Sequence, residues 1–293
     1  MDIMLNSSQA SCVACGAIVR FYGRRGEYQY HRCPSCGTIQ LVPLPTREDL
    51  ERAYVETYAT AEHISPDAAR ANRQARSHHE AVFRALIDHC VEDDVAEVGA
   101  GWGGLARLLL EKGLRYEGVE PSAAMAAHCR NLGLPVQAGN IDALNGKTYS
   151  ALVMCSVFEH LVGHDEWLQK ASQLLCTGGI LVTGQPTAHF LHFAASVLRL
   201  GRTTAPLPQL HQSFCPPWHV VLFSISGMET LLSRHGFELV DIRPMPQGRA
   251  QGMVGWAQRG VEYINRVGWP VFGIRWPLVI GHIFVFRKSR DET

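Results

Sequence analysis

Four cysteines near the start of the chain have the spacing of a metal site. Cys12 and Cys15 enclose two residues, Cys33 and Cys36 enclose two more, and a glycine follows each pair. Thiolates in this arrangement hold a structural Zn²⁺ ion tetrahedrally. Two redox dithiols are the alternative, but the βαβ pattern of a thioredoxin-like site does not surround these cysteines. We therefore predict a zinc ribbon over residues 1–45, whose metal stabilises the fold and does no chemistry.

A second candidate site lies where an apolar run, Val95 to Val98, gives way to glycines. Leucines at helical spacing follow, and then an apolar segment that begins at Tyr116 and ends on Glu120. Strand, tight turn, helix and strand in this order form a nucleotide-type βαβ unit, whose terminal acid binds ribose hydroxyls. The glycines of the turn are Gly99, Gly101, Gly103 and Gly104. We expect this unit to bind a ligand that carries a ribose.

The charge of Glu97 separates two classes of such ligands. Gly99, Gly101 and Gly104 also satisfy the G-x-G-x-x-G pattern of NAD enzymes, so an NAD-dependent oxidoreductase is one alternative. A dinucleotide places its pyrophosphate at this turn, and a carboxylate two residues before the first glycine would repel it. S-adenosylmethionine instead brings an ammonium group, for which Glu97 supplies the anion. The charges favour S-adenosylmethionine.

The segment at 97–104, E-V-G-A-G-W-G-G, resembles the first motif of class I S-adenosylmethionine-dependent methyltransferases. Segments similar to later motifs of that family follow in order at 119–122, 139–144, 151–161 and 174–183. The resemblance implies an α/β fold, with a doubly wound, seven-stranded Rossmann-like methyltransferase sheet preceded by the small zinc ribbon. It places the methyltransferase domain at residues 93–293.

The resemblance also implies which residues hold the cofactor. Glu120 would bind both ribose hydroxyls, and Asn140 with Ile141 would hold the adenine. Asn140 stands where the family usually has Asp, so a neutral amide carbonyl would accept the hydrogen bond there. The full set of expected cofactor residues is Glu97, Gly99, Gly101, Glu120, Asn140, Ile141, Cys155, Ser156 and Tyr58.

Residues 46–92 are expected to form a helical linker or cap between the ribbon and the sheet. Thr46 can cap a helix that carries Tyr54 and Tyr58 four residues apart on one face. This order resembles zinc-ribbon methyltransferases of polysaccharide and natural-product pathways, in which the tyrosine region caps the cofactor. The alternative is that both tyrosines only pack the helix onto the core.

The residues that follow the fourth strand exclude one class of acceptor. Methyltransferases acting on amide or exocyclic amino nitrogens use [DN]-P-P-[YF] there, whereas this chain has S-V-F-E at 156–159. We therefore expect O- or C-methylation of a small molecule. His219 is the first candidate for the base that removes the acceptor proton and His160 the second, with a structural role as the alternative for each. A lid insertion at about 184–218 is expected to determine which substrate binds.

The charge composition of the chain indicates which partners it attracts. The chain has 27 Lys and Arg against 27 Asp and Glu, which gives no general attraction to nucleic acid. A zinc-ribbon RNA methyltransferase remains an alternative, although the ribbon carries only a small excess of arginine. Reduced cysteines indicate the cytoplasm.

Near the C-terminus, two segments bear on partners. The apolar segment from Val267 to Phe286 contains Arg275 and two prolines, so we predict a Pro-rich loop and a last strand from Val279, with no membrane span. Residues 251–267 form an amphipathic pattern, and a packed helix, a substrate wall and a homodimer face are its three alternatives.

Overall fold

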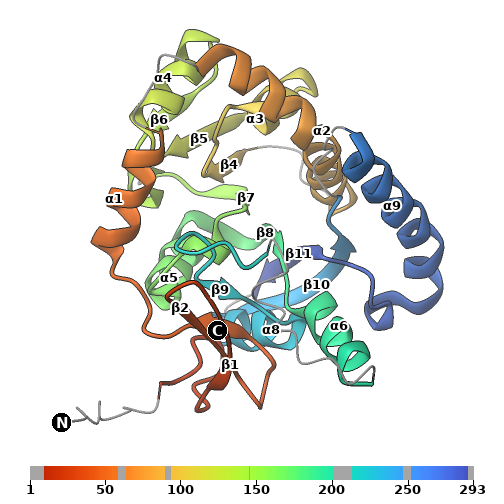
Figure 1. Ribbon diagram of the computed structural model, residues 1–293. Coiled ribbons are helices and arrows are strands. Elements are labelled where there is room, and N and C mark those ends of the chain that lie inside the picture. The colour runs from red at the N-terminus through yellow and green to blue at the C-terminus, as the bar shows by residue number, and fades with distance from the viewer. Residues whose placement is uncertain are drawn as a thin grey trace.

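The computed structural model describes residues 10–58, 64–89, 94–144, 146–200, 213–246 and 252–289. Its main element is a seven-stranded sheet with the order β10-β11-β8-β7-β4-β5-β6 (Figure 1). All neighbours are parallel except β11, which runs antiparallel to both β8 and β10. The strands are β4 (Val95–Val98), β5 (Tyr116–Glu120), β6 (Val136–Ala138), β7 (Tyr149–Cys155), β8 (Leu175–Pro186), β10 (Phe237–Pro244) and β11 (Gly281–Lys288). The expected doubly wound, seven-stranded α/β sheet is confirmed.

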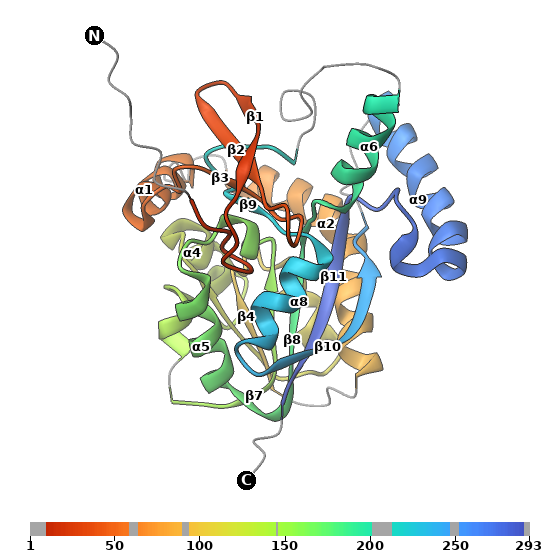
Figure 2. The same cartoon turned by 90° about the horizontal axis from the view of Figure 1, so that it is seen from below.

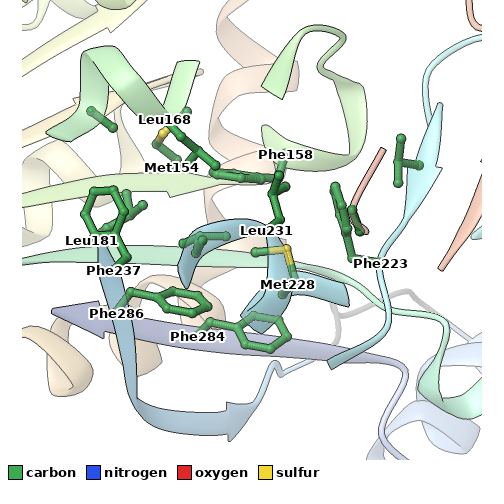
Figure 3. Close-up of a cluster of buried hydrophobic side chains, with 14 of the residues drawn as sticks. Met154, Phe158, Leu168, Leu181, Phe223, Met228, Leu231, Phe237, Phe284 and Phe286 are labelled. Atoms are coloured by element: carbon green, nitrogen blue, oxygen red, sulfur yellow. The ribbon is translucent and has the colours of Figure 1, made fainter. Parts of the chain in front are cut away.

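Helices cover both faces of this sheet, because successive strand residues point to opposite sides. Val153 and Val182 pack with α2 (Ile64–Asp88), α3 (Gly104–Glu111) and α4 (Ala123–Asn131). Their neighbours Met154 and Leu181 pack with α5 (His164–Leu174) and α8 (Ile225–Ser233) on the other face. Figure 3 shows this second cluster, in which Phe284 from β11 lies beside Met228 of α8. The central strands β7 and β8 are therefore buried on both faces.

The cysteine-containing segment forms a second sheet of four strands. It consists of β1 (Arg20–Arg25), β2 (Tyr28–Arg32), β3 (Ile39–Leu41) and β9 (Val221–Leu222), in that order. The fourth strand comes from the far half of the chain, since Ile39 pairs with Leu222 and Gln40 with Val221. Figure 2 shows this sheet at the end of the main sheet where α1 (Arg47–Tyr58) and α6 (His189–Leu200) also lie. The ribbon is thus built into the rest of the fold.

One expected loop is a helix. Residues from Val267 onward were predicted to leave the preceding helix, but α9 (Gly252–Phe272) continues through Pro270 and is followed by a short 3-10 turn, η4 (Gly273–Arg275). Trp276 explains the difference, because it folds back on α9. Its indole nitrogen donates to Asn265 Oδ1 at 2.8 Å, and its ring stacks on Phe272. This packing outweighs the local effect of the proline.

Among the helices that the structure describes, none has both the length and the hydropathy that a bilayer span requires. The segment from Gly281 to Lys288 is instead a strand, β11, in the middle of the sheet's antiparallel edge. The predicted lid lies partly outside the described residues, since 201–212 belong to none of the ranges above.

Candidate active site

The glycine turn after β4 needs glycine for two different reasons. Gly99 and Gly101 have φ angles of 80° and 54°, a region that L side chains rarely adopt. At Gly99 a Cβ would also lie 2.8 Å from Val157, whereas a Cβ on Gly101 would meet nothing within 4 Å. The backbone at Gly101 therefore faces open space, as a turn that receives a ligand requires.

Gly104 allows α2 to lie close to the turn. A Cβ there would lie 2.4 Å from the His79 ring and 2.5 Å from the Asn72 side chain. Asn72 Nδ2 also donates to the Trp102 carbonyl at 3.0 Å. Helix α2, which lies within the helical region predicted for residues 46–92, thus supports the turn from behind.

Glu120 ends β5, and its buried carboxylate accepts three hydrogen bonds. Oε2 accepts from the Gly101 N–H at 2.8 Å. Oε1 accepts from the Ser122 N–H and from the Tyr54 hydroxyl, both at 2.8 Å. The carboxylate is therefore held rigidly beside the turn, where a ribose would lie in a nucleotide-type unit.

Glu97 lies on β4, buried and close to Glu120. The hydroxyl of Tyr116 on β5 donates to Glu97 Oε2 at 2.5 Å, and Gly118 makes room for that ring. The pKa of Glu97 is raised to about 8, mainly by burial and to a smaller extent by the nearby Glu120, while the Tyr116 hydrogen bond opposes the shift. A buried acid of this kind is stabilised when a cationic group of a ligand comes close.

The predicted adenine residues follow β6. Asn140 is exposed, and its Oδ1 accepts from the Asp142 N–H at 2.9 Å, which begins the short helix η2 (Ile141–Leu144). Ile141 is buried in the core. The Asn140 oxygen is thus already partly engaged by the backbone.

Cys155 and Ser156 stand at the carboxyl end of β7 but point differently. Cys155 Sγ lies 3.3 Å from where a Cβ of Gly184 would be, and burial raises the pKa of its thiol. Ser156 is exposed and has a φ of 54°, a left-handed conformation that costs about 1 kcal/mol for a non-glycine residue. Strained residues of this kind concentrate at functional sites.

Of the two tyrosines in α1, the structure describes the side chain of Tyr54 only. Tyr54 reaches Glu120, and its ring also meets Trp218 edge to face with centroids 6.3 Å apart. Tyr58 ends α1, but its side chain lies outside the described part of the chain. Among the side chains that the structure describes in α1, Tyr54 is the one that contacts Glu120.

Both candidate bases lie beside each other, with ring centroids 5.0 Å apart. His160 Nδ1 donates to the Trp218 carbonyl at 2.8 Å, and His219 Nδ1 donates to the Ser213 carbonyl at 2.7 Å. Because a carbonyl accepts only, Nδ1 carries the proton in each ring and Nε2 keeps a lone pair. Burial lowers the pKa of both histidines, which keeps them neutral near pH 7.

Glu159 joins this pair from the short helix η3 (Phe158–His160). Its carboxyl group is buried, and Oε1 lies 3.9 Å from His160 Nε2. Burial raises the pKa of Glu159 to about 7, while the nearby His219 lowers it. Two histidines and one acid thus converge at the end of the sheet where the glycine turn also lies.

Comparison with known proteins identifies the family. A family model described as a methyltransferase domain matches residues 62–242. The chain belongs to this methyltransferase family. The match confirms the expected enzyme class and goes against the NAD-dependent alternative.

One curated relative carries a more specific name. It is a probable S-adenosylmethionine-dependent methyltransferase of Mycolicibacterium smegmatis, 27% identical over 186 residues, which are 62% of this chain and 66% of the relative. The match thus spans slightly less than two thirds of the relative's length. This relative supports S-adenosylmethionine as the cofactor of the methyltransferase.

Two solved structures share the fold. The 1,6-didemethyltoxoflavin-N1-methyltransferase of Burkholderia thailandensis, solved with 1,6-didemethyltoxoflavin and S-adenosylhomocysteine, has a TM-score of 0.50 and 15% identity, over 92% of this chain and 99% of that one. A chain of the Haloferax volcanii complex between the Trm112 methyltransferase activator and a methyltransferase has a TM-score of 0.55 and 14% identity, over 84% and 100%. At sequence identities this low, the similarity shows a shared fold and nothing further.

The four cysteines of the methyltransferase come together as their spacing predicts. Cys12 and Cys36 have their sulfur atoms 3.6 Å apart, Cys15 and Cys33 3.5 Å, and all four sulfurs lie within 4.8 Å of one another. Four thiolates around Zn²⁺ stand roughly 3.8 Å apart, because each Zn–S bond is about 2.3 Å long. The Cys12 thiol donates to Cys36, which lowers the pKa of Cys36 and raises that of Cys12. The residues fit a zinc ion.

Three residues of the methyltransferase site were missed by the sequence analysis. Tyr116 and Glu159 were not singled out, and Tyr54 was noted only as part of the tyrosine region that the resemblance places over the cofactor, while Tyr58 was the tyrosine in the cofactor set. Glu159 stands directly before His160, so a search for acids near candidate bases would have found it. Nothing local marks Tyr116, because its contact with Glu97 depends on the pairing of β4 with β5.

Proposed function

We propose that this methyltransferase transfers a methyl group from S-adenosylmethionine to an oxygen or carbon of a small molecule. The observation that carries the proposal is the pair of buried acids, Glu97 and Glu120, at a glycine turn whose Gly101 faces open space. An acid pair repels a pyrophosphate but suits a ligand with ribose hydroxyls and an ammonium group. When bound, S-adenosylmethionine supplies an electrophilic methyl group on its sulfonium.

Residues around the turn would divide the recognition of the donor. Glu120 accepts from the ribose hydroxyls, Glu97 attracts the ammonium, and Gly99 and Gly101 give the backbone room for the methionine part. Asn140 and Ile141 would hold the adenine, while Cys155 and Ser156 would border the donor at the end of β7. Support for the last pair comes from the strained backbone of Ser156.

For the acceptor, we infer proton removal by His219, with His160 as the second candidate. In both rings Nδ1–H is fixed on a carbonyl, so Nε2 presents a lone pair in a defined direction. The proton of an acceptor hydroxyl or activated C–H group would pass to that nitrogen, and a positioned base contributes on the order of a hundred- to ten-thousand-fold. A natural product or saccharide is the acceptor class we favour, and the small heterocycle named for the Burkholderia enzyme supports a small-molecule acceptor.

We further propose that Cys12, Cys15, Cys33 and Cys36 hold one structural Zn²⁺. Their geometry supports this, and the cytoplasm is the reducing compartment in which four free thiols persist. A homodimer also stays a prediction. The exposed apolar face of α9 offers a surface for it, with Trp256, Tyr263, Val267 and Val271 each at least 60% exposed.

A calorimetric titration tests the donor. We expect S-adenosylmethionine to bind and NAD to give no signal, and the reverse would return the NAD-dependent alternative. Glu120→Ala should weaken donor binding sharply, since both ribose hydroxyls lose their acceptor. Glu117→Ala is the matched control, because Glu117 lies on the same strand but bonds to Lys147 and Tyr149 away from the turn. Equal affinities for the two variants would remove the role of Glu120.

S-adenosylmethionine with an isotope-labelled methyl group then identifies the class of acceptor. Methyl incorporation into small molecules supports the proposal, whereas incorporation into RNA with binding that falls steeply with salt would favour the RNA alternative. His219→Asn and His160→Asn remove basicity but keep hydrogen bonding, so turnover should fall for the base while donor affinity holds. Full turnover in both variants would show that positioning alone carries the reaction.

A further inference from the structure

The cluster at the end of β7 combines three groups that bind transition metals. One carboxylate oxygen of Glu159 and one ring nitrogen each of His160 and His219 lie within 4.8 Å of one another. Two histidines and one carboxylate, with a position left open, form the ligand set of many catalytic zinc and non-haem iron sites. The ligands of such an ion stand roughly 3.3 Å apart, because each bond is about 2.0–2.1 Å long. Shifts of about one ångström would therefore close the site.

Hydrogen bonds to two backbone carbonyls already orient both histidines of the cluster. Metal-bound histidines almost always donate their other ring N–H to a carbonyl or carboxylate, which fixes the tautomer and the ring direction. Here the Trp218 carbonyl fixes His160, and the Ser213 carbonyl fixes His219. Both carbonyls come from the segment just before β9, so one piece of chain orients both nitrogens.

Glu159 supplies an independent observation. It is 1% exposed, and its Oε2 has no hydrogen-bond partner among the described residues. A buried carboxylate oxygen without a donor destabilises the fold. His160 Nε2, 3.9 Å from Oε1 of the same carboxyl group, keeps a lone pair while His160 is neutral and so does not donate to it. A cation placed among the three groups would satisfy all of them at once.

We propose that Glu159, His160 and His219 bind one divalent transition-metal cation of the Zn²⁺ type beside the acceptor. This proposal rests on the proposed function, which places the acceptor beside His219 and His160. Trp218 connects this cluster with the expected donor site. Its carbonyl accepts from His160, and its ring contacts Tyr54, which donates to Glu120. A bound cation lowers the pKa of an oxygen that reaches its open position. It would then replace His219 in promoting proton loss from an acceptor hydroxyl, because the Nε2 lone pair is used.

Cobalt titration of the full chain, isolated with its cysteine site loaded, tests the proposal. We expect one further Co²⁺ per chain, with d–d absorption bands and no thiolate-to-metal charge-transfer band. Glu159→Gln keeps the shape and burial but removes the charge, and His219→Asn removes the nitrogen ligand. Each should weaken Co²⁺ binding at least tenfold. His189→Asn is the control, because His189 Nε2 bonds to the Trp276 carbonyl outside the cluster.

The outcomes are separable. Co²⁺ binding that is unchanged in Glu159→Gln and His219→Asn, or that shows only thiolate bands, overturns the site. If Glu159→Gln fails to fold, His160→Asn takes its place, since the His160 side chain is 35% exposed and tolerates change. Donor affinity is measured in the same samples. Loss of Co²⁺ binding with normal donor binding supports the metal site, whereas absent donor binding in the wild type refutes the proposed function without touching the metal result.

Discussion

The hydroxyl of Tyr54 on α1 donates a hydrogen bond to Oε1 of Glu120 at the end of β5. The same oxygen accepts from the Ser122 N–H, and a carboxylate oxygen has two lone pairs. Oε1 is therefore saturated within the protein. A ribose hydroxyl can use this oxygen after Tyr54 moves away, so α1 competes with the donor for Glu120.

We therefore expect Tyr54→Phe to bind S-adenosylmethionine about two- to tenfold more tightly, because the competing hydrogen bond, worth about 0.5–1.5 kcal/mol, is gone. The phenyl ring keeps the contact with Trp218. Calorimetry measures the affinity, with Tyr263→Phe on the exposed face of α9 as the control. Weaker binding by Tyr54→Phe would mean that the hydroxyl holds the donor and that α1 is a cap.

The pH dependence of donor binding should report Glu97. Burial raises its pKa to about 8, so below that pH the carboxyl holds a proton that it must lose to attract an ammonium. Affinity should rise from about pH 6 to about pH 8, where the donor's own ammonium begins to lose its proton. Titrations in buffers of different ionisation heats would count the proton released. Glu97→Gln should bind weakly with little pH dependence, and a flat wild-type profile would contradict this role.

The same shift predicts how the stability of the donor-free protein changes with pH. The pKa of Glu97 in the folded state, about 8, lies above its ordinary value of 4.5. Between those values the folded state holds more protons, so this group's contribution is present below pH 4.5 and is lost as the pH rises through 8. Denaturant unfolding of the wild type and of Glu97→Gln across this window measures it. A difference between the two that stays constant with pH would exclude Glu97 as the cause.

Zinc analysis tests the ribbon. We expect about one Zn per chain, as a single four-cysteine site requires. Cys33→Ser should lower the melting temperature while donor affinity holds, because Glu97 and Glu120 belong to the other sheet. Cys176→Ser is the control, since Cys176 is exposed and outside the cluster. A metal-free chain whose Cys33→Ser variant loses turnover alone would make the cysteines redox groups.

Two glycine-to-alanine substitutions should change the free energy of unfolding in opposite directions, one through side-chain overlap and the other through helix propensity. Gly104→Ala should destabilise the fold by about 1–3 kcal/mol, because the new Cβ overlaps the His79 ring behind the glycine turn. Gly260→Ala should stabilise it by about 0.5–1 kcal/mol, since a Cβ at this position in α9 meets nothing within 4 Å. Chemical unfolding compares the two. Equal effects would show that α2 does not press on the turn.

The fold could be predicted because its signals are local. The apolar run at Val95, the glycines after it and the acid at Glu120 are contiguous, and each later strand carries its own pattern. The parts that could not be predicted depend on pairing between distant residues. β9 has two residues and no pattern of its own, and the contact of Tyr116 with Glu97 exists only once β4 and β5 pair.

The candidate site divides in the same way. The structure brings Glu97, Glu120 and both histidines to one end of the sheet. For Glu120 and His160 this position follows from the sequence, because residues at the carboxyl ends of parallel strands share one edge. The sequence could not show that Glu159 faces the histidines, since that depends on the turn of η3. The tertiary packing of Trp276 on α9 likewise overrode the proline signal at Pro270.

The shared strand β9 has a consequence during synthesis. Residues 42–220 separate β3 from the strand that completes its sheet, which at ordinary translation rates takes roughly 10 to 40 seconds. Throughout that interval the nascent ribbon presents the open edge of β3, with which β9 later pairs. Capture of a metal by the four thiols would hold the ribbon together while the ribosome makes the rest. The amount of zinc available in the cell during translation would then decide how much of this enzyme matures. Zinc supplied after the chain has folded would matter less.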